Sequence, residues 1–350
     1  MARRTHRRTL FLGALALAVV ASGCGKKDET SAAATGGSAA PGAAVSGTVN
    51  LVAYSTPQEA YAKLQTEFKK GAGKGVTFKE SYGASGDQSR AVENGQPADF
   101  VGYSLEPDMT RLVKAGKVAE DWDKNEHKGM VTNSVVVLIT REGNPKNIKD
   151  WDDLTKPGIE VITPNPFTSG GARWNVLAGY GAKSNKGQDA AAGKQYLLDL
   201  FKNVKVQDDS ARKSLQTFAG GKGDVLLGYE NEALFAKSKG EKLDYVVPPS
   251  TILIENPAAI TKDTKNPAAA KAFFDFVYSA DGQKIFVENG YRPVVTGVPG
   301  AEKFPTPTGL FTIKDLGGWT DVTKKFFDAK QPDSIMAEVE RSIGVAVESK

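Results

Sequence analysis

The sequence predicts an α/β protein in which a doubly wound parallel sheet is covered by helices and the chain forms two domains. Short apolar or β-branched runs alternate with amphipathic helical stretches along the chain, which is the pattern of such sheets. After a low-complexity N-terminal stretch, about 300 residues remain, a length that usually makes two domains. With one cysteine in the chain, no intramolecular disulfide can form, so the apolar core must hold the fold.

The first 23 residues predict an export signal. A basic head with four arginines precedes an apolar run over residues 9–20, and small residues occupy positions 21–23. The apolar run is well below the ~20 residues that a permanent membrane-spanning helix needs. Arg7 and Arg8 before this run also resemble a twin-arginine signal, so the sequence leaves the export route open.

Cys24 follows the small residues directly, and this arrangement resembles a lipobox, in which the cysteine is lipidated and becomes the new N-terminus. Residues 24–47 consist largely of Ala, Gly, Ser and Thr, a composition that predicts a flexible tether. We therefore expect an extracytoplasmic protein that is anchored to the cell membrane by a lipid on Cys24.

The charge of the mature chain argues against a nucleic-acid partner. The whole chain has 45 Lys and Arg against 41 Asp and Glu, and the signal contains four of the arginines and no acid. The mature chain thus has 41 of each, and it shows no basic run of the kind that nucleic-acid binders keep.

The body of the chain gives these elements in order. Strands are expected at residues 49–54, 75–82, 98–103, 133–140, 159–163 and 224–228, and helices at 59–70, 87–94, 172–180 and 267–278. The strongest strand is 133–140, which reads NSVVVLIT.

Three strand-to-helix turns are rich in glycine and serine. They span residues 54–59, 82–89 and 164–175. The unpaired N–H groups at a helix N-terminus attract anions, and glycines let an anion approach the backbone closely. In doubly wound sheets such turns gather at the carboxyl ends of the strands, where ligands bind. Spacing alone leaves phosphate, sulfate and an amino-acid carboxylate open.

The main alternative is a hydrolase of oxyanion esters. Such an enzyme needs a nucleophile, a base and usually a metal. After signal removal the chain keeps one histidine, His127, in a stretch rich in charged residues, and no HExxH, GxSxG or Walker motif occurs. We expect a binding protein without metal or cofactor.

Several motifs resemble the sulfate and thiosulfate periplasmic binding proteins, the solute-binding components of ABC importers. The most specific is Asn-Pro-x-x-Ser-Gly-Gly-Ala-Arg-Trp-Asn at residues 165–175, followed by Gly-x-Ser-Gly-x-Gln at 83–88. Shorter matches stand in the same order at residues 151–158, 209–212, 229–233, 291–293 and 317–319. The resemblance extends from about residue 49 to about residue 327.

The resemblance implies a two-lobed clamshell of the type II periplasmic binding proteins, each lobe being a doubly wound sheet flanked by helices. After the signal peptide (1–23) and the lipidated tether (24–47), one lobe comprises residues 48–128 plus 257–350, and the other comprises 129–256. It also implies a monomer that passes its ligand to the transmembrane subunits of an ABC permease.

The resemblance further implies that sulfate is held without water by uncharged donors. A dianion with no proton suits a site made only of donors, whereas mono-protonated phosphate would leave its O–H unpaired at a cost of roughly 1–3 kcal/mol. The implied donors are the backbone N–H groups of Ser55, Ser85, Ser169, Gly170, Gly171 and Ala211 and the side chain of Tyr229.

Two positions depart from the family pattern. Ser55 stands where an aspartate is usual, and Tyr229 stands where a tryptophan donates its indole N–H. A tyrosine hydroxyl can accept as well as donate, so thiosulfate and molybdate stay open as ligands. Arg173, Arg212 and Glu230 lie beside the site motifs. We expect them to support the site without touching the ligand, because the family binds its ligand with no cation in contact.

Overall fold

The computed structural model describes residues 44–331, 333–345 and 347. The expected signal peptide, Cys24 and most of the expected tether lie outside these residues. Among the described residues, no helix has both the length and the apolar character needed to cross a membrane.

In the described part of the chain, nine strands form one sheet. In chain order they are β1 (Ser46–Tyr54), β2 (Gly75–Gly83), β3 (Phe100–Gly102), β4 (Met130–Arg141), β5 (Val161–Pro164), β6 (Val204–Asp208), β7 (Val225–Tyr229), β8 (Leu243–Val246) and β9 (Leu253–Ile260).

Helices cover this sheet. The α-helices are α1 (Gln58–Phe68), α2 (Ser85–Glu93), α3 (Glu106–Lys114), α4 (Gly170–Lys183), α5 (Ala190–Lys202), α6 (Ala211–Ala219), α7 (Glu230–Ser238), α8 (Pro267–Tyr278), α9 (Ala280–Glu288), α10 (Gly318–Phe327) and α11 (Ile335–Ser342). Three short 3-10 helices are η1 (Trp151–Thr155), η2 (Ala301–Lys303) and η3 (Ile313–Leu316).

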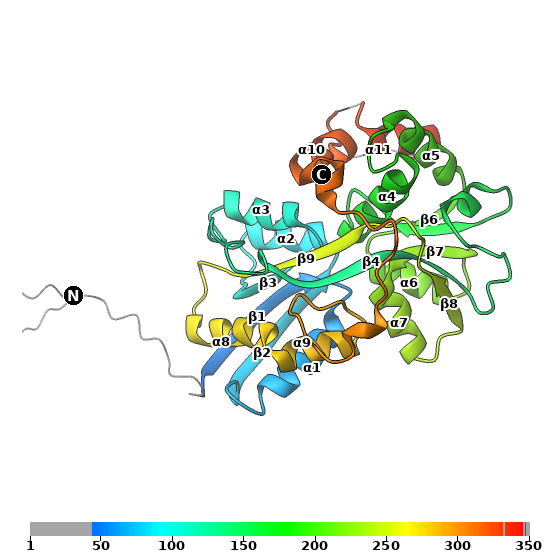
Figure 1. The fold of residues 1–350 in the computed structure, drawn as a ribbon. Helices are drawn as coiled ribbons and strands as arrows, with labels where there is room; N and C mark the ends of the chain where they lie inside the picture. Colours follow the sequence, from blue (N-terminus) through cyan, green and yellow to red (C-terminus); the bar gives the residue numbers. More distant parts are fainter. Residues whose placement is uncertain (1–43, 332, 346, 348–350) are drawn as a thin grey trace, which may run out of the picture. The chain divides into compact units, whose positions relative to one another are not determined.

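The sheet contains two parallel groups joined by two long strands. The strand order is β2-β1-β3-β9-β4-β7-β5-β6, and β8 pairs with β4. We call β1–β3 with their helices the first half, and β5–β8 with their helices the second half. Pairing is parallel among β1, β2 and β3 and among β5, β6 and β7. The connecting strands β4 and β9 run antiparallel to their neighbours, so the sheet is mixed and not parallel throughout. In Figure 1 these two strands pass between the halves.

Alternate residues of the buried strands serve cores on opposite faces of the sheet. In β4, Val136 and Leu138 belong to one apolar cluster, while Val135, Val137 and Ile139 belong to another. Because helices cover both faces, both sets of side chains are buried. This two-sided burial explains why the sequence of β4 is continuously apolar and not alternating.

The beginning of the body differs from the expected boundary. β1 begins at Ser46, within the range expected as tether, because Ser46 and Gly47 continue the parallel ladder opposite Gly75 and Val76 of β2. The pairing therefore extends β1 toward the N-terminus.

The C-terminal helices pack with the second half. Trp319 and Phe326 of α10 lie against Trp174 and Tyr180 of α4, with ring centroids 4.8 and 4.7 Å apart. In Figure 1 α10 and α11 lie beside α4 and α5. We expected residues 257–350 as part of the first lobe, but α10 and α11 share the apolar core of the second half. The other boundaries of the two lobes stay a prediction.

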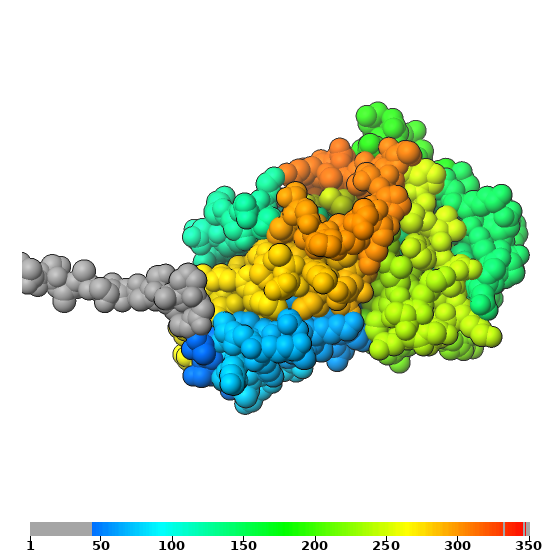
Figure 2. Space-filling model, turned by 60° about the horizontal axis from the view of Figure 1, so that its bottom comes forward, coloured from blue at the N-terminus to red at the C-terminus, as the bar shows by residue number. Residues whose placement is uncertain are grey.

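Between α9 and α10 the chain returns across the molecule. In Figure 2 this orange segment runs between the yellow helices α8 and α9 and the yellow-green part of the second half. Arg292 at its start pairs with Asn133 of β4, and Phe311 near its end pairs with Ile252. The segment thus links both halves to the connecting strands.

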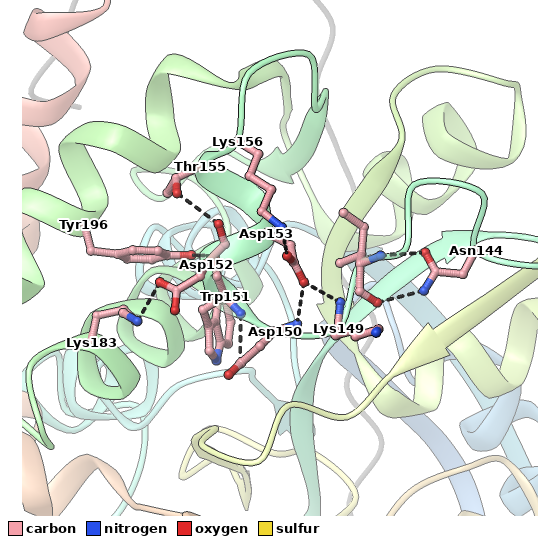
Figure 3. A network of polar contacts seen from close by, with 11 residues as sticks. Asn144, Lys149, Asp150, Trp151, Asp152, Asp153, Thr155, Lys156, Lys183 and Tyr196 are labelled. Atoms are coloured by element: carbon pink, nitrogen blue, oxygen red, sulfur yellow. Dashed lines mark hydrogen bonds and ion pairs between the residues drawn. The ribbon is translucent and has the colours of Figure 1, made fainter.

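The Trp-Asp-Asp-Leu motif at residues 151–154 is structural. Asp150 and Asp153 form a reciprocal capping box at the start of η1, which Figure 3 shows in detail. Trp151 is buried and donates its indole N–H to the carbonyl of Ser250 at 2.8 Å. Tyr196 donates its hydroxyl to the carbonyl of Trp151 at 2.9 Å. These contacts fasten η1 to α5 and to the chain before β9.

Candidate anion-binding site

Six strand-to-helix turns surround one small cavity between the two halves. Three of these turns follow β1, β2 and β3, and three follow β5, β6 and β7. This is where a doubly wound fold is expected to bind a ligand. The cavity measures about 10 Å³, far below the ~300 Å³ at which drug-sized sites begin. Its lining comprises Tyr54, Ser55, Thr56, Gly83, Ala84, Ser85, Ser104, Ser169, Gly170, Gly171, Ser210, Ala211 and Tyr229.

All seven residues predicted as ligand contacts line this cavity. Ser55 and Ser85 come from the first half, and the other five come from the second half. Ser55 and Tyr229, which are nearly 175 positions apart in sequence, thus line the same small cavity. Whether they bind a ligand stays a prediction at this point.

Three helices begin at the cavity. Ser85, Gly170 and Ala211 are the first residues of α2, α4 and α6. Among the described residues, no hydrogen-bond acceptor is found for the backbone N–H groups of Ser55, Ser85, Gly170, Gly171 or Ala211. A helix N-terminus leaves such groups unpaired and adds the positive end of its dipole. The cavity wall therefore offers several free N–H donors.

Ser169 differs from its expected role. Its backbone N–H donates to the carbonyl of Asn165 at 2.9 Å and is not free for a ligand. Its side-chain oxygen accepts from the N–H of Ala172 at 3.3 Å and caps α4. Because the hydroxyl keeps its own proton, the hydroxyl of Ser169, and not its N–H, is the group that can donate into the cavity.

Tyr229 is placed to act as a neutral donor. Its side chain is buried, and its hydroxyl lies 2.6 Å from that of Ser104. Burial raises the pKa of Tyr229 well above its ordinary value, so the hydroxyl keeps its proton at physiological pH.

Arg212 has its charge neutralised away from the cavity. Its guanidinium contacts the carboxylate of Glu232 with two bonds of 2.9 Å and that of Glu59 at 2.7 Å. It also donates to the carbonyl of Thr56 at 2.8 Å. Because Glu59 and Thr56 belong to the first half, Arg212 of α6 fastens the two halves together.

Arg173 and Glu230 also lie outside the cavity lining. Arg173 donates to the carbonyl of Pro166 at 2.9 Å, stacks 4.9 Å above the ring of Phe327 and faces a separate, larger groove. Glu230 is buried and accepts from Arg292 at 2.8 and 3.1 Å. The expectation that these residues stay off the ligand therefore agrees with their positions.

The lining of the cavity contains no Lys, Arg, His, Asp or Glu. An anion there meets only dipoles and uncharged donors, which avoids the cost of burying a cation with it. Behind the wall, the carboxylate of Asp108 accepts from the hydroxyl of Ser85 at 2.6 Å. In the described part of the chain, no group of three or more His, Cys, Asp or Glu side chains is placed to hold a metal ion.

Ser104 is a cavity residue that the sequence reasoning missed. It stands two residues after the end of β3, at the carboxyl edge of the sheet. The turn after β3 has no glycine and only one serine, so it lacks the composition that marked the other turns. The rule that ligands bind where parallel strands end would have identified it.

The fold and the cavity define a two-lobed binding protein with a small uncharged cavity between its lobes. A family model described as "Bacterial extracellular solute-binding protein" matches residues 49–292. The chain belongs to this family, whose members act outside the cytoplasm, and its relatives are binding components of transporters and not enzymes.

Individual relatives agree with this assignment. A sulfate-binding protein of Synechococcus elongatus is 41% identical over 337 residues, covering 92% of this chain and 94% of the relative. A thiosulfate-binding protein of Pseudomonas aeruginosa is 32% identical over 291 residues, covering 79% of this chain and 88% of the relative.

A solved structure shares the fold. The sulfate-binding protein SubI from Mycobacterium tuberculosis H37Rv superposes with a TM-score of 0.79 at 47% identity, covering 80% of this chain and 99% of that chain. The predicted clamshell fold of the periplasmic binding proteins is confirmed.

Proposed function

We propose that this chain captures sulfate outside the cytoplasm and delivers it to the permease of an ABC importer. The observation that supports this most directly is a small cavity whose wall, among the described residues, combines free backbone N–H groups from both halves with no charged side chain. Sulfate carries two charges and no proton, so it can accept from every donor of such a wall. The sulfate-binding relatives point to the same ligand.

Binding involves both halves. Ser55 and Ser85 donate from the first half, and Ser169, Gly170, Gly171, Ala211 and Tyr229 donate from the second half. Because the donor set is complete only when the halves meet, the ligand favours closure by hinge rotation. The closed monomer then docks on the transmembrane subunits of the permease.

A thiosulfate or molybdate ligand is the alternative within the same role. The thiosulfate-binding relative and the hydroxyl of Tyr229, which can accept as well as donate, are the two observations in its favour.

Thermal denaturation tests the proposed ligand. Sulfate at 100 times its dissociation constant should stabilise the folded protein by roughly 2.7 kcal/mol, because it binds only the folded state. Sodium chloride of equal ionic strength is the control and should leave the melting temperature nearly unchanged. A melting temperature that responds to neither sulfate, thiosulfate nor molybdate would refute the proposal.

We further propose that the mature protein is anchored to the membrane by a lipid on Cys24, with residues 24–47 as the tether. The order of basic head, apolar run, small residues and cysteine supports this. Cells grown with labelled fatty acid should incorporate label into the wild-type protein and not into Cys24→Ala. Equal labelling of the two, or none in either, would contradict the anchor.

A further inference from the structure

Ser104 and Tyr229 form a hydroxyl pair inside the cavity. Their oxygens lie 2.6 Å apart, and both residues line the space between the halves. Either hydroxyl can be the donor of this bond, since each carries one proton and can also accept. The other proposed ligand donors are backbone N–H groups, which cannot accept, and the hydroxyl of Ser169, which caps α4.

The surroundings of Ser104 fix its position and leave its hydroxyl free to turn. Its backbone N–H donates to the hydroxyl oxygen of Ser85 at 2.9 Å. Its carbonyl accepts from the indole of Trp174 at 2.9 Å and from the amide of Asn256 at 3.2 Å. None of these bonds uses the side-chain oxygen of Ser104, so replacing it with alanine keeps the backbone anchored from both halves.

The hydroxyl of Ser85 does not supply a second turning proton. It donates to the carboxylate of Asp108 at 2.6 Å while it accepts from Ser104. A carboxylate can only accept, so the proton of Ser85 stays directed away from the cavity. Of these three hydroxyls, those of Ser104 and Tyr229 are the ones whose protons can change direction.

We infer that the Ser104–Tyr229 pair determines ligand selectivity and lets the site accept a mono-protonated tetrahedral oxyanion, such as the hydrogen phosphate dianion, beside sulfate. This inference rests on the proposed function of the cavity. When Ser104 donates to Tyr229, the tyrosine proton points to the ligand and the wall consists of donors, which suits sulfate. When Tyr229 donates to Ser104, the tyrosine oxygen is free to accept the proton of a protonated ligand, and Ser104 donates in its place.

Removing the hydroxyl of Ser104 should leave only the arrangement in which the proton of Tyr229 points to the ligand. In Ser104→Ala the tyrosine proton loses its partner and turns to the ligand. Sulfate still finds a donor there, but the proton of hydrogen phosphate is left without an acceptor. An unpaired buried polar group weakens binding by about tenfold or more.

The test is calorimetric titration of the full mature protein with sulfate and with inorganic phosphate. Wild type should bind both anions, and Ser104→Ala should raise the phosphate-to-sulfate ratio of dissociation constants by about tenfold or more. The matched control is Ser89→Ala. Ser89 is equally buried and donates to the carbonyl of Asp108, but it lies outside the cavity lining, so the ratio should stay at the wild-type value.

A second measurement uses wild type alone. At a pH below the pKa of the second ionisation of phosphate, the ligand carries two protons, one more than the Ser104–Tyr229 pair can accept. Phosphate should therefore bind more weakly at this pH, while sulfate binding stays constant. An unchanged ratio in Ser104→Ala, or wild type that binds sulfate but no phosphate, overturns the inference and leaves the proposed function standing. Wild type that binds phosphate but no sulfate overturns the proposed function, and with it the expectation that the site takes both anions.

Discussion

Two largely buried arginines outside the cavity lining are neutralised by acidic partners. Arg212 is held by Glu232 and Glu59, and Arg292 is held by Glu230. Removing one member of such a buried pair leaves an uncompensated charge at a cost of several kcal/mol. The pairs therefore keep the cavity free of charge and fix the starts of α6 and α7.

Glu340 of α11 is a buried acid that has no charged partner among the described residues. It is fully buried, and one of its oxygens accepts from the amide of Gln207 at 2.9 Å. The other oxygen has no partner, and neither has the amide oxygen of Gln207. Burial raises the pKa of Glu340 above its ordinary range, so folding favours its neutral form.

Glu340→Gln should therefore stabilise the protein at neutral pH and above. A folded-state pKa above the unfolded value of about 4.3 means that stability is fully present at low pH and is lost as pH rises through the folded pKa. The glutamine does not titrate and can pair with both groups of the Gln207 amide. We expect a gain of about 1 kcal/mol or more at neutral pH and little difference in acid.

Urea unfolding of both proteins in acid and at neutral pH checks this expectation. Glu338→Gln is the matched control on the same helix. Its carboxylate is 44% exposed and pairs with Lys194 at 2.7 Å, so its loss should cost at most about 1 kcal/mol. A Glu340→Gln protein less stable than wild type at neutral pH would show that the carboxylate is ionised and satisfied.

The sequence predicted which residues line the cavity better than it predicted which of their atoms can donate to a ligand. Ser55, Gly170 and Ala211 stand in turns whose composition or motif could be recognised, and they line the cavity as predicted. The prediction that the N–H of Ser169 donates to the ligand was wrong, because this N–H donates to the carbonyl of Asn165 within the same tight turn. Ser104 was missed because its importance depends on a contact with Tyr229, 125 positions away.

At the level of secondary structure, long buried elements were predicted best. The strand expected at 133–140 is the centre of β4 (Met130–Arg141), and the helix expected at 172–180 is the centre of α4 (Gly170–Lys183). Their apolar runs are long enough to determine the type of element, whereas their ends depend on partners and caps. Ser169, for example, caps α4, which begins at Gly170, two residues before the predicted start.

β9 was not predicted, because its sequence contains Asn256 and Pro257. A proline lacks the N–H that a central strand donates. In the structure Pro257 stands where β9 changes partner, since residues 253–257 pair with β4 and residues 258–260 pair with β3. The proline is tolerated at this switch, which no local pattern reveals.

The connecting strands shape the molecule as a whole. β4 pairs with β9 through its first part and with β7 and β8 through its second part. The two halves thus share strands, and the described residues form one compact unit. The sequence predicted two domains from length, but the extent of this sharing follows from pairings between distant segments.

The halves lie close together at Gly170. A Cβ atom at this position would lie 2.7 Å from the Cβ and the hydroxyl oxygen of Ser104 and 2.9 Å from Leu105. Any larger residue at 170 must therefore displace Ser104 and Leu105 of the first half. The glycine is needed for the closed arrangement in which donors of both halves face one cavity.

Calorimetric titration of sulfate into wild type and Gly170→Ala tests the central claim most directly. We expect one sulfate per wild-type chain and an affinity about one to two decades lower in Gly170→Ala, because overpacking costs about 1–3 kcal/mol. Gly71→Ala, whose added Cβ meets nothing nearer than 4.0 Å, should bind like wild type. Wild type that gives no heat with sulfate, or Gly170→Ala that binds sulfate as tightly as wild type, would contradict the account.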